Sequence, residues 1–183
     1  MKHRPVVEPE LSRPLLVDKI PAGGIEEHVV ASPAERKALV ARFGLLDLGK
    51  LEADLNVDRE KGHMIAVTGT LTADVVQPCV VTLEPVPAHI TDSIDILFAP
   101  RAILDVGANP PHSDAIEDEA PEPIVNGLID LGELVAQHLA VALDPYPRKP
   151  GVSLDAVKSE PPGENTYKPF AKLVELKNKP LKQ

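Results

Sequence analysis

Apolar and polar residues alternate without a break from Leu51 to Asp58, and this period of two constrains the fold more than any other feature of the chain. Because successive side chains of a β-strand point to opposite faces of a sheet, the pattern predicts a strand with one buried face. The residues between the apolar ones are mostly acidic, so the other face is predicted to be wet and negatively charged. The buried set is Leu51, Ala53, Leu55 and Val57, and the wet set is Glu52, Asp54, Asn56 and Asp58.

Similar alternation predicts two further strands, over residues 65–75 and 90–98. Shorter apolar segments at residues 25–31 and 80–83 predict short strands, and Gln77-Pro78 is predicted to interrupt the strand before the second of them. The connections between consecutive strands are short, which favours an antiparallel meander.

A helix is predicted from Pro33 to Phe43 by the signals at its two ends. Ser32 suits the N-cap, Pro33 suits the first helical position, and Glu35 completes a capping box. Gly44 follows the helix, and its missing Cβ suits the left-handed conformation that ends many helices.

A second helix is predicted to begin at Asp130, which repeats the capping pattern together with Glu133. The sequence Asp144-Pro145-Tyr146-Pro147 is predicted to end it. Its apolar residues recur at helical spacing, which predicts one buried stripe. The stripe consists of Leu131, Leu134, Val135, Leu139 and Ala142.

Residues 99–123 and 147–183 differ in character from the rest of the chain. The first segment is rich in proline and acidic residues and predicts a long, mobile, acidic loop. The second predicts a polar, basic tail with one short helix near residues 169–176. The chain is therefore predicted to form a single α+β domain over residues 1–146, followed by the tail. Its sheet is expected to be antiparallel, with about four to six strands and two packed helices, and the pattern leaves open whether the sheet is curled or closes like a barrel.

The formal net charge of −9 argues against a protein that binds nucleic acid over its whole surface, because such binding needs a basic field. The charge reverses in the C-terminal tail, where lysines outnumber acids. We therefore expect RNA or partner contacts at basic residues of the tail and at two apolar residues of its helix. These candidate residues are Arg148, Lys149, Lys168, Phe170, Lys172, Leu173, Lys177 and Lys179.

The sequence contains none of the common enzyme motifs: no Gly-rich phosphate loop, no dinucleotide-binding fingerprint and no Gly-x-Ser-x-Gly elbow. The histidines are scattered, and His138 is expected to be partly buried with a hydrogen-bond partner. The single cysteine, Cys79, precedes Val80 and Val81 and is expected to be a buried, unreactive thiol. We therefore predict that the protein is not an enzyme and has no catalytic residue, metal site or cofactor.

The N-terminal residues lack the apolar run of a signal peptide, and no stretch approaches the roughly 18 apolar residues of a membrane span. We therefore expect a cytoplasmic protein that does not contact membranes. The oligomeric state is left open.

Three stretches of the chain are informative when they are taken together. The first is VTGTLTADV at residues 67–75, followed by Cys79, and the second is IDLGELV at residues 129–135, continued by LAVALDP. The third is KPFAKLVELK at residues 168–177. In this order, and with an acidic, proline-rich loop between the first two, they resemble the YceD-like family.

The resemblance implies a role in the accumulation of large-subunit (23S) ribosomal RNA, by binding rather than by catalysis, and contact with the rRNA or its precursor. Some members carry a Cys-x-x-Cys element and later cysteines or histidines. Here Thr82 stands in place of the second cysteine, and no Cys or His follows Tyr146-Pro147. The resemblance therefore does not extend a metal site to this chain.

A second interpretation is an acidic protein-interaction module that does not contact RNA. In it, the wet strand face and the acidic loop around residues 117–119 would hold a basic ribosomal protein or assembly factor, and charge complementarity would select the partner.

Overall fold

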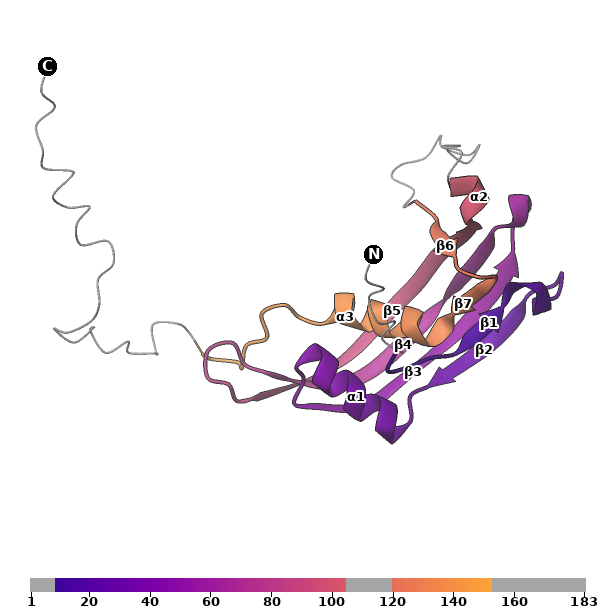
Figure 1. Ribbon diagram of the computed structural model, residues 1–183. Helices are drawn as coiled ribbons and strands as arrows, with labels where there is room; N and C mark the ends of the chain where they lie inside the picture. The colour runs from indigo at the N-terminus through magenta and orange to yellow at the C-terminus, as the bar shows by residue number, and fades with distance from the viewer. Residues whose placement is uncertain (1–8, 105–119, 153–183) are drawn as a thin grey trace, which may run out of the picture. The chain divides into compact units, whose positions relative to one another are not determined.

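The computed structural model describes residues 9–104 and 120–152 of the 183-residue chain (Figure 1). The chain divides into two units, Met1–Pro150 and Gly151–Gln183, and the helices and strands that the structure describes belong to the first.

A five-stranded sheet forms the centre of this unit, with the strand order β2-β3-β4-β5-β6 (Figure 1). The first four strands pair antiparallel with their neighbours, and β6 pairs in parallel with the end of β5. The sheet does not close into a barrel, because β2 and β6 are its two edges. Its strands are β2 (Ile25–Val30), β3 (Asp47–Arg59), β4 (Ile65–Pro78), β5 (Pro85–Pro100) and β6 (Glu122–Ile124).

A two-stranded sheet and two main helices lie on one face of the five-stranded sheet (Figure 1). The small sheet joins residues far apart in sequence, since β1 near the N-terminus pairs with β7 just before the last helix of the unit. The elements are β1 (Pro14–Leu16), β7 (Leu128–Asp130), α1 (Pro33–Phe43) and α3 (Leu131–Ala142), with a short α2 (Arg101–Leu104) and the 3-10 turns η1 (Val17–Lys19) and η2 (Lys61–His63).

The core lies between the sheet and the two helices, and it is aliphatic. The alternation over residues 51–58 is confirmed, because Leu51, Ala53, Leu55 and Val57 are all buried while the residues between them are exposed or half-buried. The same alternation in β4 buries Val67, Leu71, Ala73 and Val75. Helix α1 contributes Leu39 to this cluster, and α3 contributes Leu131, Leu134, Val135 and Leu139.

The predicted boundaries of α1 are confirmed by their hydrogen bonds. The backbone N–H of Glu35 donates to the Ser32 hydroxyl, and the backbone N–H of Ser32 donates to the Glu35 carboxylate at 2.7 Å, so the capping box is complete. Gly44 ends the helix in the left-handed conformation, with φ 67°.

Asp130 caps α3 as predicted, but Glu133 has a different role. The Asp130 carboxylate accepts from the backbone N–H groups of Gly132 and Glu133. It also accepts from Arg13 in the N-terminal segment, so that the cap holds this segment against the start of the helix. The Glu133 carboxylate instead pairs with Arg42 of α1 at 2.8 Å, which joins the two helices.

Two predictions about the sheet were wrong. Residues 80–83 form a turn rather than a strand, because the backbone N–H of Cys79 donates to Glu84 O and that of Leu83 donates to Cys79 O. Gln77-Pro78 does not interrupt β4, which continues to Pro78 and pairs there with Pro85. Proline at the end of a hairpin costs no essential hydrogen bond, whereas the apolar run at 80–83 resembles a strand only in composition.

The segment predicted as one loop, residues 99–123, contains the end of β5, the helix α2 and part of β6. Residues 105–119, with the acidic run, lie outside the described part of the chain. The predicted tail helix near residues 169–176 also lies outside it.

Candidate functional site

The face of the five-stranded sheet turned away from α1 and α3 is polar, and we call it the outer face. The strand register places its residues in rows, because directly paired residues of neighbouring strands point to the same side. One row is His28, Asp54, Thr70 and Ser93, and the next is Glu52, Thr72 and Thr91. The full set also includes Glu26, Asp47, Lys50, Asn56, Asp58, Thr68, Asp74, His89 and Asp95.

Acidic groups dominate the outer face. Its one lysine, Lys50, is held by Glu52 at 2.7 Å, and the carboxylate raises the pKa of that ammonium group. The two histidines are each held by an aspartate at 2.6 Å, His28 by Asp54 and His89 by Asp74. The basic side chains of this face are therefore already paired, while carboxylates remain exposed along β3.

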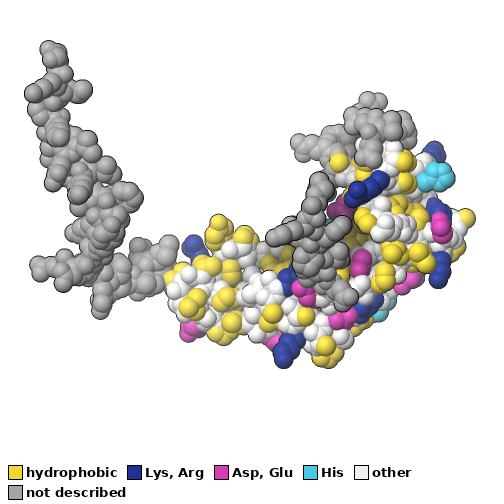
Figure 2. Space-filling model, in the orientation of Figure 1, with side chains coloured by type: hydrophobic (Ala, Val, Ile, Leu, Met, Phe, Trp, Pro, Cys, Tyr) yellow, Lys and Arg dark blue, Asp and Glu magenta, His cyan; other side chains and the backbone are white. Residues whose placement is uncertain are grey.

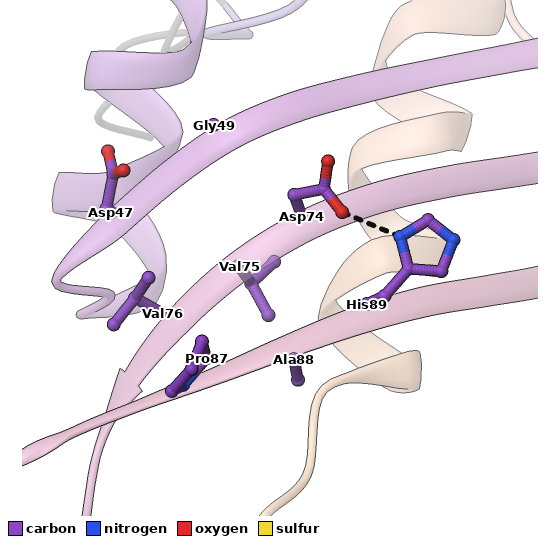
Figure 3. Close-up of a pocket in the computed structure, with 8 residues that line it drawn as sticks. All are labelled: Asp47, Gly49, Asp74, Val75, Val76, Pro87, Ala88 and His89. Carbon is purple, nitrogen blue, oxygen red and sulfur yellow. Dashed lines mark hydrogen bonds and ion pairs between the residues drawn. The ribbon is translucent and has the colours of Figure 1, made fainter.

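A hollow of about 340 Å³ lies at one end of the outer face, where β3, β4 and β5 meet (Figure 3). A register shift between Leu48 and Lys50 marks a bulge of β3 at this point, beside Gly49. Asp47, Val76 and Pro87 form one row of the hollow, since Asp47 pairs with Val76 and Val76 with Pro87. Asp74 and His89 form the adjoining row, and Figure 3 shows the hydrogen bond between them.

The hollow combines an apolar floor with carboxylates at its rim. Val76 and Pro87 supply apolar surface, and Asp47 and Asp74 supply the acids. No serine, threonine, cysteine or lysine side chain lines it. Apolar surface and carboxylates therefore lie side by side in the hollow.

The single cysteine lies in the turn between β4 and β5 and is fully buried, as predicted. The Thr82 hydroxyl and the backbone N–H groups of Lys149, Thr82 and Val81 lower the pKa of its thiol to about 6. The same end of the unit is held by a bond from the backbone N–H of Val80 to Pro147 O at 2.9 Å. Because the sulfur is closed off from solvent, the lowered pKa does not make it an accessible nucleophile.

Only two of the predicted contact residues belong to the described part of the chain. Arg148 is exposed, and Lys149 pairs with Glu84 at 3.0 Å, which lowers the pKa of that carboxyl. Both lie beside the β4–β5 turn rather than on the outer face. The other six predicted residues, Lys168, Phe170, Lys172, Leu173, Lys177 and Lys179, lie outside the described residues.

His138 is partly buried on α3, as predicted, with 21% of its side chain exposed. Its Nδ1 lies 3.7 Å from an Asp92 carboxylate oxygen, which is an ion-pair distance but too long for a hydrogen bond.

Among residues 9–104 and 120–152, no group of three or more His, Cys, Asp or Glu side chains is placed to hold a metal ion. None of the helices that the structure describes is long and apolar enough to cross a membrane.

Sequence reasoning missed the hollow. The alternation places Asp74 and His89 on wet strand faces, but Asp47 precedes the predicted strand, and nothing local relates the three residues. The register of β3, β4 and β5 alone brings them together.

Comparison with known proteins gives one match. A family model described as "Large ribosomal RNA subunit accumulation protein YceD" matches residues 67–177, more than half of the chain. No curated protein and no solved structure matches the chain.

Proposed function

The chain belongs to the YceD family of large ribosomal RNA subunit accumulation proteins, and from this premise we propose that it is a ribosome-biogenesis factor that acts by binding. Membership implies a role in the accumulation of large-subunit rRNA. The proposal adds the mechanism: the protein contacts the large-subunit rRNA, its precursor or an assembly intermediate, without catalysing a reaction. It also implies that the protein works in the cytoplasm.

The family match supports this proposal because it includes the basic residues near the C-terminus. It continues past the described unit to residue 177 and so includes Arg148, Lys149 and the tail residues Lys168, Lys172 and Lys177. These residues are basic in a chain whose formal net charge is −9. Phosphate groups are bound by such local basic clusters, and each contact makes the affinity more dependent on salt.

The described surface supports an RNA contact outside the outer face. Exposed carboxylates along β3 would repel a phosphate backbone there. Aromatic residues make up only 3% of the chain, so stacked bases are a poor basis for recognition. We infer that the RNA is recognised by its backbone and shape, through the tail that we propose for residues 147–183.

A binding role also agrees with the chemistry of the described residues. Cys79 is enclosed, and the hollow is lined by aspartates, one histidine and small apolar groups. Asp74 and His89 are hydrogen-bonded to each other, but no serine, threonine, cysteine or lysine side chain lines the hollow beside them.

Crosslinking in cells followed by sequencing of the bound RNA tests the proposal. The full chain is compared with a full-length variant in which Lys168, Lys172 and Lys177 are changed to Gln. We expect large-subunit rRNA fragments with the full chain, a loss of about tenfold or more in the variant, and binding in vitro that weakens steeply with salt.

The matched control changes three exposed lysines of the described unit, Lys19, Lys37 and Lys61, to Gln. This control changes the net charge by the same amount as the tail variant and should keep the rRNA crosslinks. Equal losses in both variants would show that only the overall charge matters. Capture of a basic ribosomal protein without any rRNA would favour the second interpretation, a protein-binding module.

A further inference from the structure

The outer face is a sheet face that none of the described elements covers. Helices α1 and α3 and the small sheet all lie on the opposite face (Figure 1). Strands β3, β4 and β5 present outward side chains to solvent along β3, which spans Asp47–Arg59, and β2 adds a fourth strand beside Glu52–Val57. At about 3.3 Å per residue, this length matches an extended peptide of roughly a dozen residues.

The chemistry of this face selects the class of partner. Its side chains are mainly carboxylates and the hydroxyls of threonine and serine, which are short and accept hydrogen bonds. The alternation of β3 repeats its acidic positions every second residue, as in Glu52 and Asp54. An extended chain also repeats its side chains every second residue, so basic residues of such a chain would meet acids at matching intervals.

The hollow supplies a point at which such a chain could be anchored. An arginine or lysine side chain could place its methylene groups over Val76 and Pro87 and its charged end between Asp47 and Asp74. Figure 3 shows that the two carboxylates lie on the same side of the strands that carry them. Lys50 does not fill this position, because its ammonium group pairs with Glu52 and its side chain does not line the hollow.

We propose that the outer face is a docking surface for an extended, lysine- and arginine-rich segment of a partner protein, with one basic side chain seated in the hollow between Asp47 and Asp74. The residues of this surface are not the basic residues of the proposed function, and the inference does not depend on contact of those residues with RNA. The two proposals together give the protein two groups of binding residues of opposite charge, one for a basic protein segment and one for nucleic acid.

Titration of the full chain with synthetic peptides tests the inference. The probe is an extended peptide of about a dozen residues in which lysine or arginine alternates with serine, compared with a peptide that has glutamate in place of the basic residues. We expect the basic peptide to bind and the acidic peptide not to bind. The double variant Asp47→Asn, Asp74→Asn should weaken binding about fivefold or more, since it removes both acids of the hollow.

The matched control is Asp18→Asn with Glu122→Gln. Both residues are exposed and lie off the outer face, and the double substitution changes the net charge by the same amount. It should leave the affinity of the basic peptide unchanged. Equal weakening by the two double variants would overturn the inference, because binding would then follow only the overall charge, and so would failure of the basic peptide to bind at all.

Different variants test the inference and the proposed function, so one can be contradicted without the other. The hollow variant should keep the rRNA crosslinks of the full chain, and the tail-lysine variant should keep its affinity for the basic peptide. Loss of the rRNA crosslinks in the hollow variant, with its thermal unfolding unchanged, would show that the outer face binds RNA and would overturn the inference.

Discussion

At the scale of single residues, Cys79 has a thiol whose pKa depends on two segments of the chain. It accepts hydrogen bonds from its own turn and from Lys149, and these bonds favour the thiolate. The sequence predicted only a buried, unreactive thiol at this position. Most of these bonds, that of the Thr82 hydroxyl first, come from the turn itself, and the Lys149 N–H adds one from a segment distant in sequence. The effect on the pKa therefore depends on the folded shape of the turn, which was predicted as a strand.

Stability should therefore depend on pH through Cys79. The pKa of the thiol is about 6 in the folded protein, below its ordinary value of 9.0. Between these two values the unfolded state binds more protons than the folded state. The free energy of unfolding should therefore rise as the pH increases from about 6 towards 9.0, and this contribution should be lost as the pH falls through about 6. Urea unfolding at about pH 5 and about pH 8 measures this change.

Cys79→Ser is the comparison for this measurement, because a serine hydroxyl does not ionise in this range. The variant should lose the part of the pH dependence that comes from the thiolate. An identical pH dependence in both proteins would contradict the assignment.

Gly132 is a second residue whose role depends on a close approach. A Cβ at this position would lie 2.8 Å from Leu11 O and 2.9 Å from Arg13 N. Both are backbone atoms, so a larger side chain would push the N-terminal segment away from the start of α3. This explains the glycine in the stretch Leu131-Gly132-Glu133.

We expect Gly132→Ala to lower the free energy of unfolding by about 1–3 kcal/mol, the range of an overpacked buried site. Gly23→Ala is the matched control, because no atom lies within 4 Å of a Cβ at that position. Urea unfolding of the two variants should separate them clearly, and an equal effect would show that the close approach does not matter.

At the scale of elements, α1 is joined to the rest of the unit by ion pairs at both ends. Arg13 binds both oxygens of Glu35 at the start of the helix, at 2.7 and 3.1 Å. Arg42, near its end, binds Glu10 and Glu133. Leu39 alone is fully buried among the helix residues, so the polar contacts at the ends fix much of the helix position.

Glu35→Gln should lower the free energy of unfolding near neutral pH by about 1–2 kcal/mol, because it weakens the Arg13 pair and the capping box together. The pair holds the pKa of Glu35 at about 2, below its ordinary 4.5. Its contribution is complete above the ordinary value and is lost as the pH falls through about 2, so the variant and the parent protein should converge in acid.

Lys37→Gln on the same helix is the control for Glu35→Gln. Lys37 is exposed, and its substitution should change stability by less than about 0.5 kcal/mol. A Glu35→Gln protein that differed from its parent equally at neutral and acid pH would show that the charge of the pair is unimportant.

At the scale of the whole molecule, the core residues of the described unit lie between Leu11 and Leu139. The segment just after α3 adds polar contacts. The Gln77 side chain, which is buried, donates to Asp144 O at 2.9 Å, and the backbone N–H of Val80 donates to Pro147 O. Residues up to about Pro147 are therefore part of the folded unit.

A chain that ends at Pro150 should thus unfold at the same urea concentration as the full protein. A chain that ends at Leu143 should be less stable by about 1–3 kcal/mol, since it leaves the buried Gln77 amide without its acceptor. A large loss of stability in the longer of these chains would place the boundary of the unit further along the sequence.

Much of the fold followed from the sequence because its causes are local. Apolar and polar residues that alternate give a strand one buried face whatever its neighbours are. The alternation in Leu51–Asp58 and Ile65–Val75 was therefore enough to predict two strands. Ser32, Gly44 and Asp130 end or begin helices through bonds to residues that are near in sequence. The same reasoning failed at residues 80–83, where an apolar run folds as a turn.

The sequence by itself determined the class of this protein: an α+β unit with one acidic strand face, and a family resemblance that the match over residues 67–177 supports. Only the tertiary structure decided the pairing of β1 with β7, the parallel position of β6, and the register that gathers Asp47, Asp74 and His89 around a hollow. The physical reason is that periodicity fixes which side of a strand is wet, whereas strand order and register depend on contacts between residues far apart in the chain.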